Sequence, residues 1–144
     1  MKNTIELKVP ALSENEQFVR NAIASFALSL NTSLNEMTDL KTAVSEAFTN
    51  IVIHAYPGSE GYATIKATIE GNKIEVTIAD EGVGIKDLEQ AQKPFYTTKS
   101  EEERSGMGFT IMQTFTNEFE VKNKENGKGL IVRMLKEFNN GRTI

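Results

Sequence analysis

Cysteine is absent from the 144 residues of this sequence, and His54 is its only histidine. The lack of cysteine excludes disulfide bonds, thiolate zinc sites and cysteine nucleophiles, and a lone histidine argues against a histidine-rich metal centre. Lys and Arg form no basic block, and the formal net charge at pH 7 is −4. Proteins that bind nucleic acid through its phosphates carry basic surfaces, so this composition argues against direct nucleic-acid binding.

Long apolar runs are also missing. The longest runs fall far short of the ~20 residues of a transmembrane helix, and the opening residues MKNTIELKVP contain no apolar stretch suited to a signal peptide. We therefore expect a cytoplasmic protein with no membrane association. The composition, 39% hydrophobic and 25% charged, is typical of a globular chain, and the length predicts one domain over residues 1–144.

Two long amphipathic helices are predicted by apolar residues that recur at helical spacing. The first is expected from about 14 to 30, and the second over 37–55, ending before the turn YPGSEG. Each is preceded by a serine that is followed three residues later by a glutamate, the capping-box spacing typical of a helix start. These pairs are Ser13 with Glu16 and Ser33 with Glu36.

Alternating apolar residues predict strands on both sides of these helices. The strands are expected at 4–9, 62–70, 73–80, 119–124 and 130–138, with the turns GN and ENGKG closing two hairpins. A polar loop over 86–105 and a short helix from near Gly108 complete the pattern. This order of elements predicts an α+β fold, a two-layer α/β sandwich with helices on one face of a mostly antiparallel sheet.

The segment DEGVGI, residues 80–85, follows a strand directly. Asp80 has the strand parity of the apolar residues before it, so its carboxylate is expected to point into the dry layer and to need a partner. One interpretation is an aspartate that caps a turn. The other is an acceptor for an exocyclic amine such as that of adenine, because Gly82 and Gly84 allow close backbone approach or positive φ.

The segment SGMGF, residues 105–109, places Gly106 and Gly108 at the start of the predicted short helix. Free backbone N–H groups at a helix start attract anions, and small residues let phosphates come close. A GxG before a helix also has many purely structural uses. No Walker A sequence and no complete GxGxxG is present, so P-loop and Rossmann sites have no support.

Glu46, Asn50 and His54 share one stripe of the second predicted helix, beside its apolar stripe. A carboxylate can accept a proton from an attacking hydroxyl, and an amide oxygen can bind Mg²⁺. The alternative is an ordinary solvated helix edge, and a lone histidine fits a helix-end or packing role. Farther along, Thr97, Thr98, Lys99 and Arg104 predict either a lid over phosphates or a charged surface loop.

Together these clusters resemble the Bergerat-type ATP-binding fold shared by gyrase, heat-shock protein 90, histidine kinases and MutL. Glu46 and Asn50 match its N box, DEGVGI its first glycine box and SGMGF its second, in the same order and spacing. More narrowly, SENE at 13–16, TTKSEEERSGMGFTIM at 97–112 and the length resemble the anti-sigma factor F family of spore-forming bacilli, which are serine-protein kinases.

The resemblance implies a role for each matching residue. Asp80 would accept the adenine amine in a pocket shaped by Gly82 and Gly84, Asn50 would hold Mg²⁺ across the phosphates, and Glu46 would be the general base for the substrate serine. The phosphates of ATP or ADP would lie against a set of loop residues on the second glycine box and the lid. This set is Thr97, Thr98, Lys99, Arg104, Ser105, Gly106 and Gly108.

The resemblance also implies partners. These are a sigma factor bound in the ATP state and an anti-anti-sigma protein phosphorylated on serine, with the kinase acting as a homodimer. Arg20, on the polar side of the first helix, is a candidate partner contact. Two alternatives stay open, a general-stress relative and a non-catalytic ATP-dependent sigma-binding module. One departure is Leu130, where relatives commonly carry a threonine that supports the adenine-binding aspartate.

Overall fold

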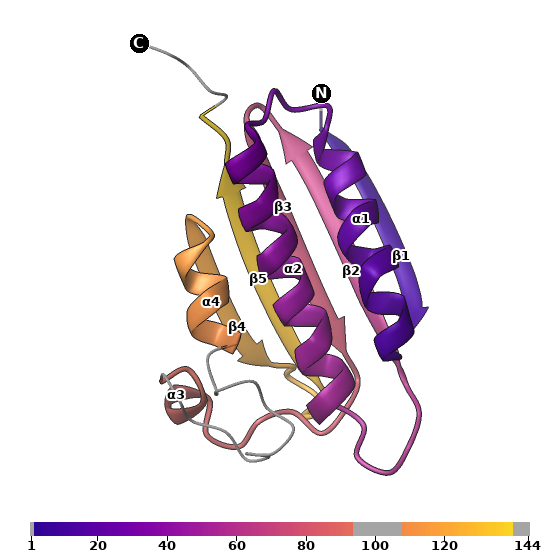
Figure 1. The fold of residues 1–144 in the computed structure, drawn as a ribbon. Coiled ribbons are helices and arrows are strands. Elements are labelled where there is room, and N and C mark those ends of the chain that lie inside the picture. Colours follow the sequence, from indigo (N-terminus) through magenta and orange to yellow (C-terminus); the bar gives the residue numbers. More distant parts are fainter. Residues whose placement is uncertain (1, 94–107, 140–144) are drawn as a thin grey trace.

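One five-stranded sheet forms a layer of the molecule in the computed structural model, which describes residues 2–93 and 108–139 (Figure 1). In spatial order the strands are β1 (Asn3–Pro10), β2 (Tyr62–Glu70), β3 (Lys73–Asp80), β5 (Leu130–Glu137) and β4 (Glu118–Asn123). Every neighbouring pair is antiparallel. All five predicted strands are therefore present, within one or two residues of their expected ends.

The second layer consists of α1 (Glu16–Ala27), preceded by the 3₁₀ turn η1 (Ser13–Asn15), α2 (Leu34–His54) and α4 (Gly108–Thr114). The short α3 (Leu88–Ala91) lies apart from this layer, at one end of the molecule (Figure 1). Figure 1 shows α1, α2 and α4 side by side over the same face of the sheet. The predicted α+β class, with helices on one face of the sheet, is confirmed. In the part of the chain that the structure describes, no helix combines the length and apolarity needed to cross a membrane.

The two predicted capping boxes have different outcomes. Ser33 accepts a hydrogen bond from the Glu36 N–H, and the Glu36 carboxylate accepts one from the Ser33 N–H, each over 3.1 Å, so the box at α2 is confirmed. The box at α1 is wrong, because η1 shifts the helix start and Asn15 takes the N-cap position without a side-chain hydrogen bond. Glu16 instead forms an ion pair with Arg20 one turn later, with 3.2 Å between Glu16 Oε2 and Arg20 Nε.

The hydrophobic core lies between the sheet and the helices, on the face of the sheet that carries the apolar side chains. Apolar side chains of β2 and β3 are buried at every second position and pack under α1 and α2. The largest fully buried side chains come from every part of the chain and include Ile23, Phe48, Ile65, Met112 and Phe138. The alternation in β3 continues to its last residue, so Asp80 enters the helical layer as its parity predicts.

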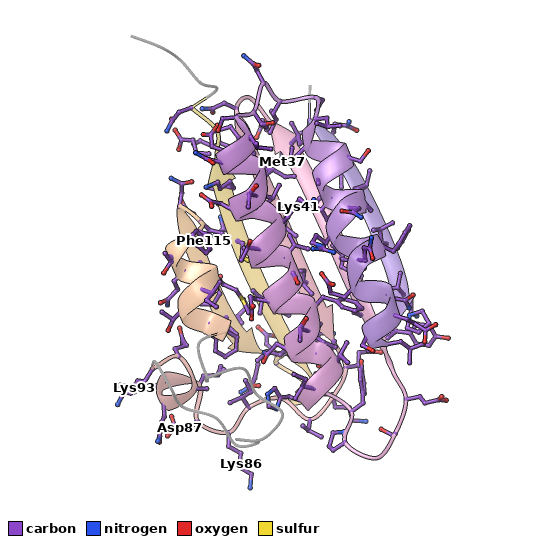
Figure 2. All side chains as sticks on the ribbon, viewed as in Figure 1. Met37, Lys41, Lys86, Asp87, Lys93 and Phe115 are labelled. Atoms are coloured by element: carbon purple, nitrogen blue, oxygen red, sulfur yellow. The ribbon has the colours of Figure 1, made fainter. Side chains whose placement is uncertain are left out.

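The ends of α2 and β3 meet at one edge of the molecule (Figure 1). The segment after β3 runs from there to α3, a single turn inside the region expected to be a polar loop. Asp87 caps this turn by accepting the Gln90 N–H over 3.0 Å, an Asx-type local bond that composition alone does not reveal. Figure 2 shows Lys86, Asp87 and Lys93 projecting at this edge of the molecule.

Candidate functional site

Asp80 is a buried carboxylate at the end of β3, with 4% of its surface exposed. Its Oδ1 accepts two backbone hydrogen bonds, from the Gly82 N–H over 2.8 Å and from the Leu130 N–H over 3.3 Å. Among the described residues, none donates to Oδ2. The turn-capping interpretation is therefore correct for one oxygen, and ligand binding by the other oxygen stays a prediction.

Burial raises the pKa of Asp80 above its ordinary value, although the N–H groups of Gly82 and Leu130 and the charge of Lys124 partly offset the rise. Desolvation disfavours the ionised form, and a further hydrogen-bond donor at Oδ2 would favour it again. A ligand N–H group at this position would therefore relieve the cost of the buried charge. A perturbed carboxyl group beside a pocket is typical of a functional site.

Glycines allow three backbone segments to meet at Asp80. A Cβ on Gly82 would lie 2.0 Å from the Ala55 carbonyl oxygen at the end of α2, and a Cβ on Gly129 would lie 2.0 Å from the Asp80 carbonyl oxygen. Gly84 has a φ of +71° and Gly129 a φ of +113°, conformations that residues with side chains rarely adopt. Gly82 thus has a packing role, and its contact with nucleotide stays a prediction.

A pocket at this edge brings two of the sequence clusters together. Asn50 and His54 of α2 line it together with Asp80 and Gly84. The remaining lining residues are Ile85, which ends the first glycine box, Leu130, the position that the resemblance places beside Asp80, and Ala55, which the sequence did not mark. The predicted pairing of Asn50 with Asp80 in one site is therefore present, and His54, expected at a helix end, also lines the pocket.

Glu46 lies one helical turn before Asn50, half-buried on the same flank of α2. Its Oε2 is 3.7 Å from the position that a Cβ on Gly108 would take, so the first residue of α4 lies beside this carboxylate. Glu46 also lines a groove between α1 and α2 with Arg20 and Lys41, and Figure 2 labels Lys41 on α2. Gly84 of the first glycine box thus lies near Asn50, and Gly108 of the second lies near Glu46.

The remaining predicted phosphate and lid residues lie outside the described residues, and their roles stay predictions. They are Thr97, Thr98, Lys99, Arg104, Ser105 and Gly106. Within residues 2–93 and 108–139, no group of three or more histidine or acidic side chains forms a metal site. Asn50 as a single protein ligand is compatible with Mg²⁺, because Mg²⁺ in nucleotide sites usually takes only one or two protein ligands and is otherwise bound by phosphates and water.

Comparison with known proteins relates this geometry to a family. A model described as a histidine kinase-like ATPase domain matches residues 9–136. The anti-sigma F factor of Thermoanaerobacter sp. (strain X514) is 52% identical over 134 residues and covers 93% of both chains. The anti-sigma F factor of Bacillus subtilis is 43% identical, covering 100% of this chain and 99% of its own.

The chain belongs to the anti-sigma F factor family. Among solved structures, the catalytic domain of histidine kinase ThkA superposes with a TM-score of 0.57 at 18% identity, covering 94% of this chain and 97% of that chain. This likeness shows that the two share a fold. Family and fold together confirm the Bergerat-type resemblance, nucleotide binding and an enzyme of the ATP-using kinase class.

Proposed function

We propose that this chain is an anti-sigma factor that holds a sigma factor in its ATP-bound state and phosphorylates an anti-anti-sigma protein on serine. The observation that carries the proposal is the pocket in which the buried Asp80 faces Asn50. Oδ2 of Asp80 is the acceptor for the adenine amine, and Asn50 lies on the phosphate side. The names of the relatives, all anti-sigma F factors, support the sigma-factor partner.

The transfer step assigns a role to Glu46. The serine hydroxyl oxygen attacks the γ-phosphorus, Glu46 accepts the hydroxyl proton, and the bond to the β,γ-bridging oxygen breaks to release ADP. When bound through Asn50 and the phosphates, Mg²⁺ supplies charge neutralisation to this reaction. The N–H groups at Gly106 and Gly108 and the cations Lys99 and Arg104 bind the phosphates.

The groove that Glu46 shares with Arg20 and Lys41 supports a protein substrate. It leads along the helical layer to the carboxylate, so a segment of the partner that enters it would bring a hydroxyl to Glu46. Arg20 is accordingly proposed as a partner contact. The proposed working form is a homodimer, as the family resemblance implies, and the proposed location is the cytoplasm, as expected from the lack of long apolar runs.

The test is intact-mass spectrometry of a candidate anti-anti-sigma protein after incubation with this chain and MgATP. The expected result is a gain of one phosphoryl group, lost with Glu46→Gln, while ATP binding persists in that variant. Equal transfer by both proteins would refute the general-base role. ATP binding without any transfer would instead favour the non-catalytic sigma-binding module, and transfer to a general-stress partner alone would favour that relative.

A further inference from the structure

The side-chain amide of Asn123 holds both backbone groups of Ile85. Oδ1 of Asn123 accepts from the Ile85 N–H over 2.9 Å, and Nδ2 donates to the Ile85 carbonyl over 2.7 Å. Two hydrogen bonds to one residue fix its orientation as well as its position. Asn123 is the last residue of β4, 38 residues away in sequence, and it does not line the pocket that contains Asp80.

One rung of the β4–β5 hairpin holds both ends of the segment from Asp80 to Ile85. Asn123 and Leu130 are Cα partners in the ladder. Leu130 donates its N–H to Asp80, while Asn123 binds Ile85. The spacing between the acceptor carboxylate and the opposite end of the glycine-containing segment is therefore set by two neighbouring residues of one hairpin.

The other side of the segment is fixed by the end of α2. The Val83 N–H donates to the Ala55 carbonyl over 2.9 Å, and the Glu81 N–H donates to the Tyr56 hydroxyl over 2.9 Å. These bonds hold Glu81 and Val83 against the end of α2. Among the hydrogen bonds of the described residues, only the two to Asn123 hold Ile85 from the side of the sheet.

Gly84 fits tightly under the Asn123 amide. A Cβ at Gly84 would lie 2.6 Å from Asn123 Oδ1, and Gly84 has a φ of +71°. Gly84 and Ile85 both line the pocket opposite Asn50. Asn123 thus determines how far the backbone wall of the pocket stands from Asp80, although it lies behind that wall.

We infer that Asn123 is a positioning residue for nucleotide binding: it fixes Gly84 and Ile85 against Asp80 and thereby sets the affinity for the nucleotide base. The inference rests on the nucleotide site of the proposed function. It predicts that Asn123 acts on binding and not on phosphoryl transfer, because its contacts are with the loop after Asp80 and Glu46 lies on α2.

The experiment compares Asn123→Ala and Asn123→Asp with the parent chain by calorimetric titration with ADP and by transfer kinetics in MgATP. Both variants are expected to bind ADP about tenfold more weakly. Asn123→Ala loses both hydrogen bonds to Ile85, and Asn123→Asp loses the bond to the Ile85 carbonyl and gains a repulsive contact with it. KM for ATP should rise accordingly, while kcat at saturating ATP stays within about twofold of the parent value.

The variant Asn123→Asp distinguishes a positioning role of the Asn123 side chain from a space-filling role. Aspartate has the size of asparagine, but it places an oxygen against the Ile85 carbonyl, so a space-filling role would leave its ADP affinity unchanged. This variant also carries the test if Asn123→Ala fails to fold. The matched control is Asn126→Ala in the same hairpin turn, which loses only a local bond to the Lys128 N–H of 2.9 Å and should bind ADP normally.

Parent-like ADP affinity in Asn123→Asp, with the parent itself binding ADP, would overturn the inference and leave the proposed function intact. Failure of the parent chain to bind ADP would overturn the proposed function and the inference with it. A fall in kcat without a change in KM or ADP affinity would also contradict the inference, because that pattern indicates a role in the chemical step.

Discussion

The Leu130 backbone N–H lies 3.3 Å from Oδ1 of Asp80, across 50 residues of sequence. The contact uses the backbone of Leu130, so it does not depend on a side-chain hydroxyl such as that of the threonine which the family resemblance led us to expect at this position. Leu130 has only 5% of its surface exposed and packs in the core. The departure at this position therefore preserves a hydrogen bond to the acceptor carboxylate.

Asp80→Asn should abolish tight nucleotide binding without unfolding the protein. The two N–H groups that now donate to Oδ1 would hold the asparagine oxygen in the same place, so Nδ2 would take the position of Oδ2. A donor would then face the adenine amine. We expect ADP affinity to fall at least about tenfold, the usual worth of a hydrogen bond to a charged group, as measured by calorimetric titration.

The same variant has a predicted effect on stability. Because the pKa of Asp80 is raised, its contribution to stability is complete below its unfolded pKa of about 3.9 and declines as the pH rises through its folded pKa. At pH 7 the nucleotide-free Asp80→Asn protein should be at least as stable as the parent in urea. Asp39→Asn, at the other end of α2 beside Lys136, is the control and should bind ADP normally. A less stable Asp80→Asn protein would contradict the sign of this argument.

Gly129→Ala should be strongly destabilising. A methyl group at this position would lie 2.0 Å from the Asp80 carbonyl oxygen, at a φ of +113°. Backbone atoms cannot move aside as side-chain ends do, so we expect a loss above about 2 kcal/mol in free energy of unfolding. Gly127→Ala has a similar positive φ, +74°, but open space around it, and should cost about 1 kcal/mol. Similar urea midpoints for the two variants would contradict the steric argument.

The sequence pattern predicted the direction of Asp80, because strand parity is a local property. It did not predict that Leu130, Asn123 and Ala55 hold the segment after Asp80. Those contacts join residues far apart in sequence and use backbone groups, which every residue possesses and no pattern marks. The capping box at Glu16 failed for a different, local reason. The 3₁₀ turn η1 moves the start of α1 so that Asn15 takes the N-cap position, and Glu16 forms an i,i+4 ion pair with Arg20.

The capping box at α2 gives a pH-dependent prediction. Burial opposes ionisation of Glu36, but hydrogen bonds from the N–H groups of Asn139 and Ser33, with the nearby charge of Lys136, place the pKa of Glu36 below its ordinary value. The ionised Glu36 carboxylate therefore stabilises the fold above the pKa that Glu36 has in the unfolded chain, about 4.3. This stabilisation is lost as the pH falls through the lower pKa that Glu36 has in the folded protein.

Glu36→Gln should accordingly be less stable than the parent at pH 7, and the difference should be smaller at pH 3. Urea unfolding at both pH values measures it, with Ser33→Ala as a second variant that should cost about 1 kcal/mol as a lost N-cap. A constant difference between Glu36→Gln and the parent across this range would show that the charge of Glu36 is not the stabilising feature.

Arg20→Glu tests the proposed partner contact on the helical face. Arg20 lies in the groove with Glu46 and Lys41, on α1 and away from the pocket around Asp80. Reversing its charge should weaken binding of the partner proteins while ADP affinity stays at the parent level. The new carboxylate would face Glu16 at i,i+4, so a loss of about 0.3–0.5 kcal/mol in stability is expected.

Arg20→Gln is the matched control for that repulsion, because it removes the positive charge without adding a negative one. If Arg20 contacts a partner through its charge, both variants should lower partner affinity in pull-down or titration measurements, with the larger loss in Arg20→Glu. Unchanged partner affinity in both variants would exclude a contact through Arg20. Any contact between the partner and the groove would then involve Lys41 and the hydroxyl groups of α2 that line it.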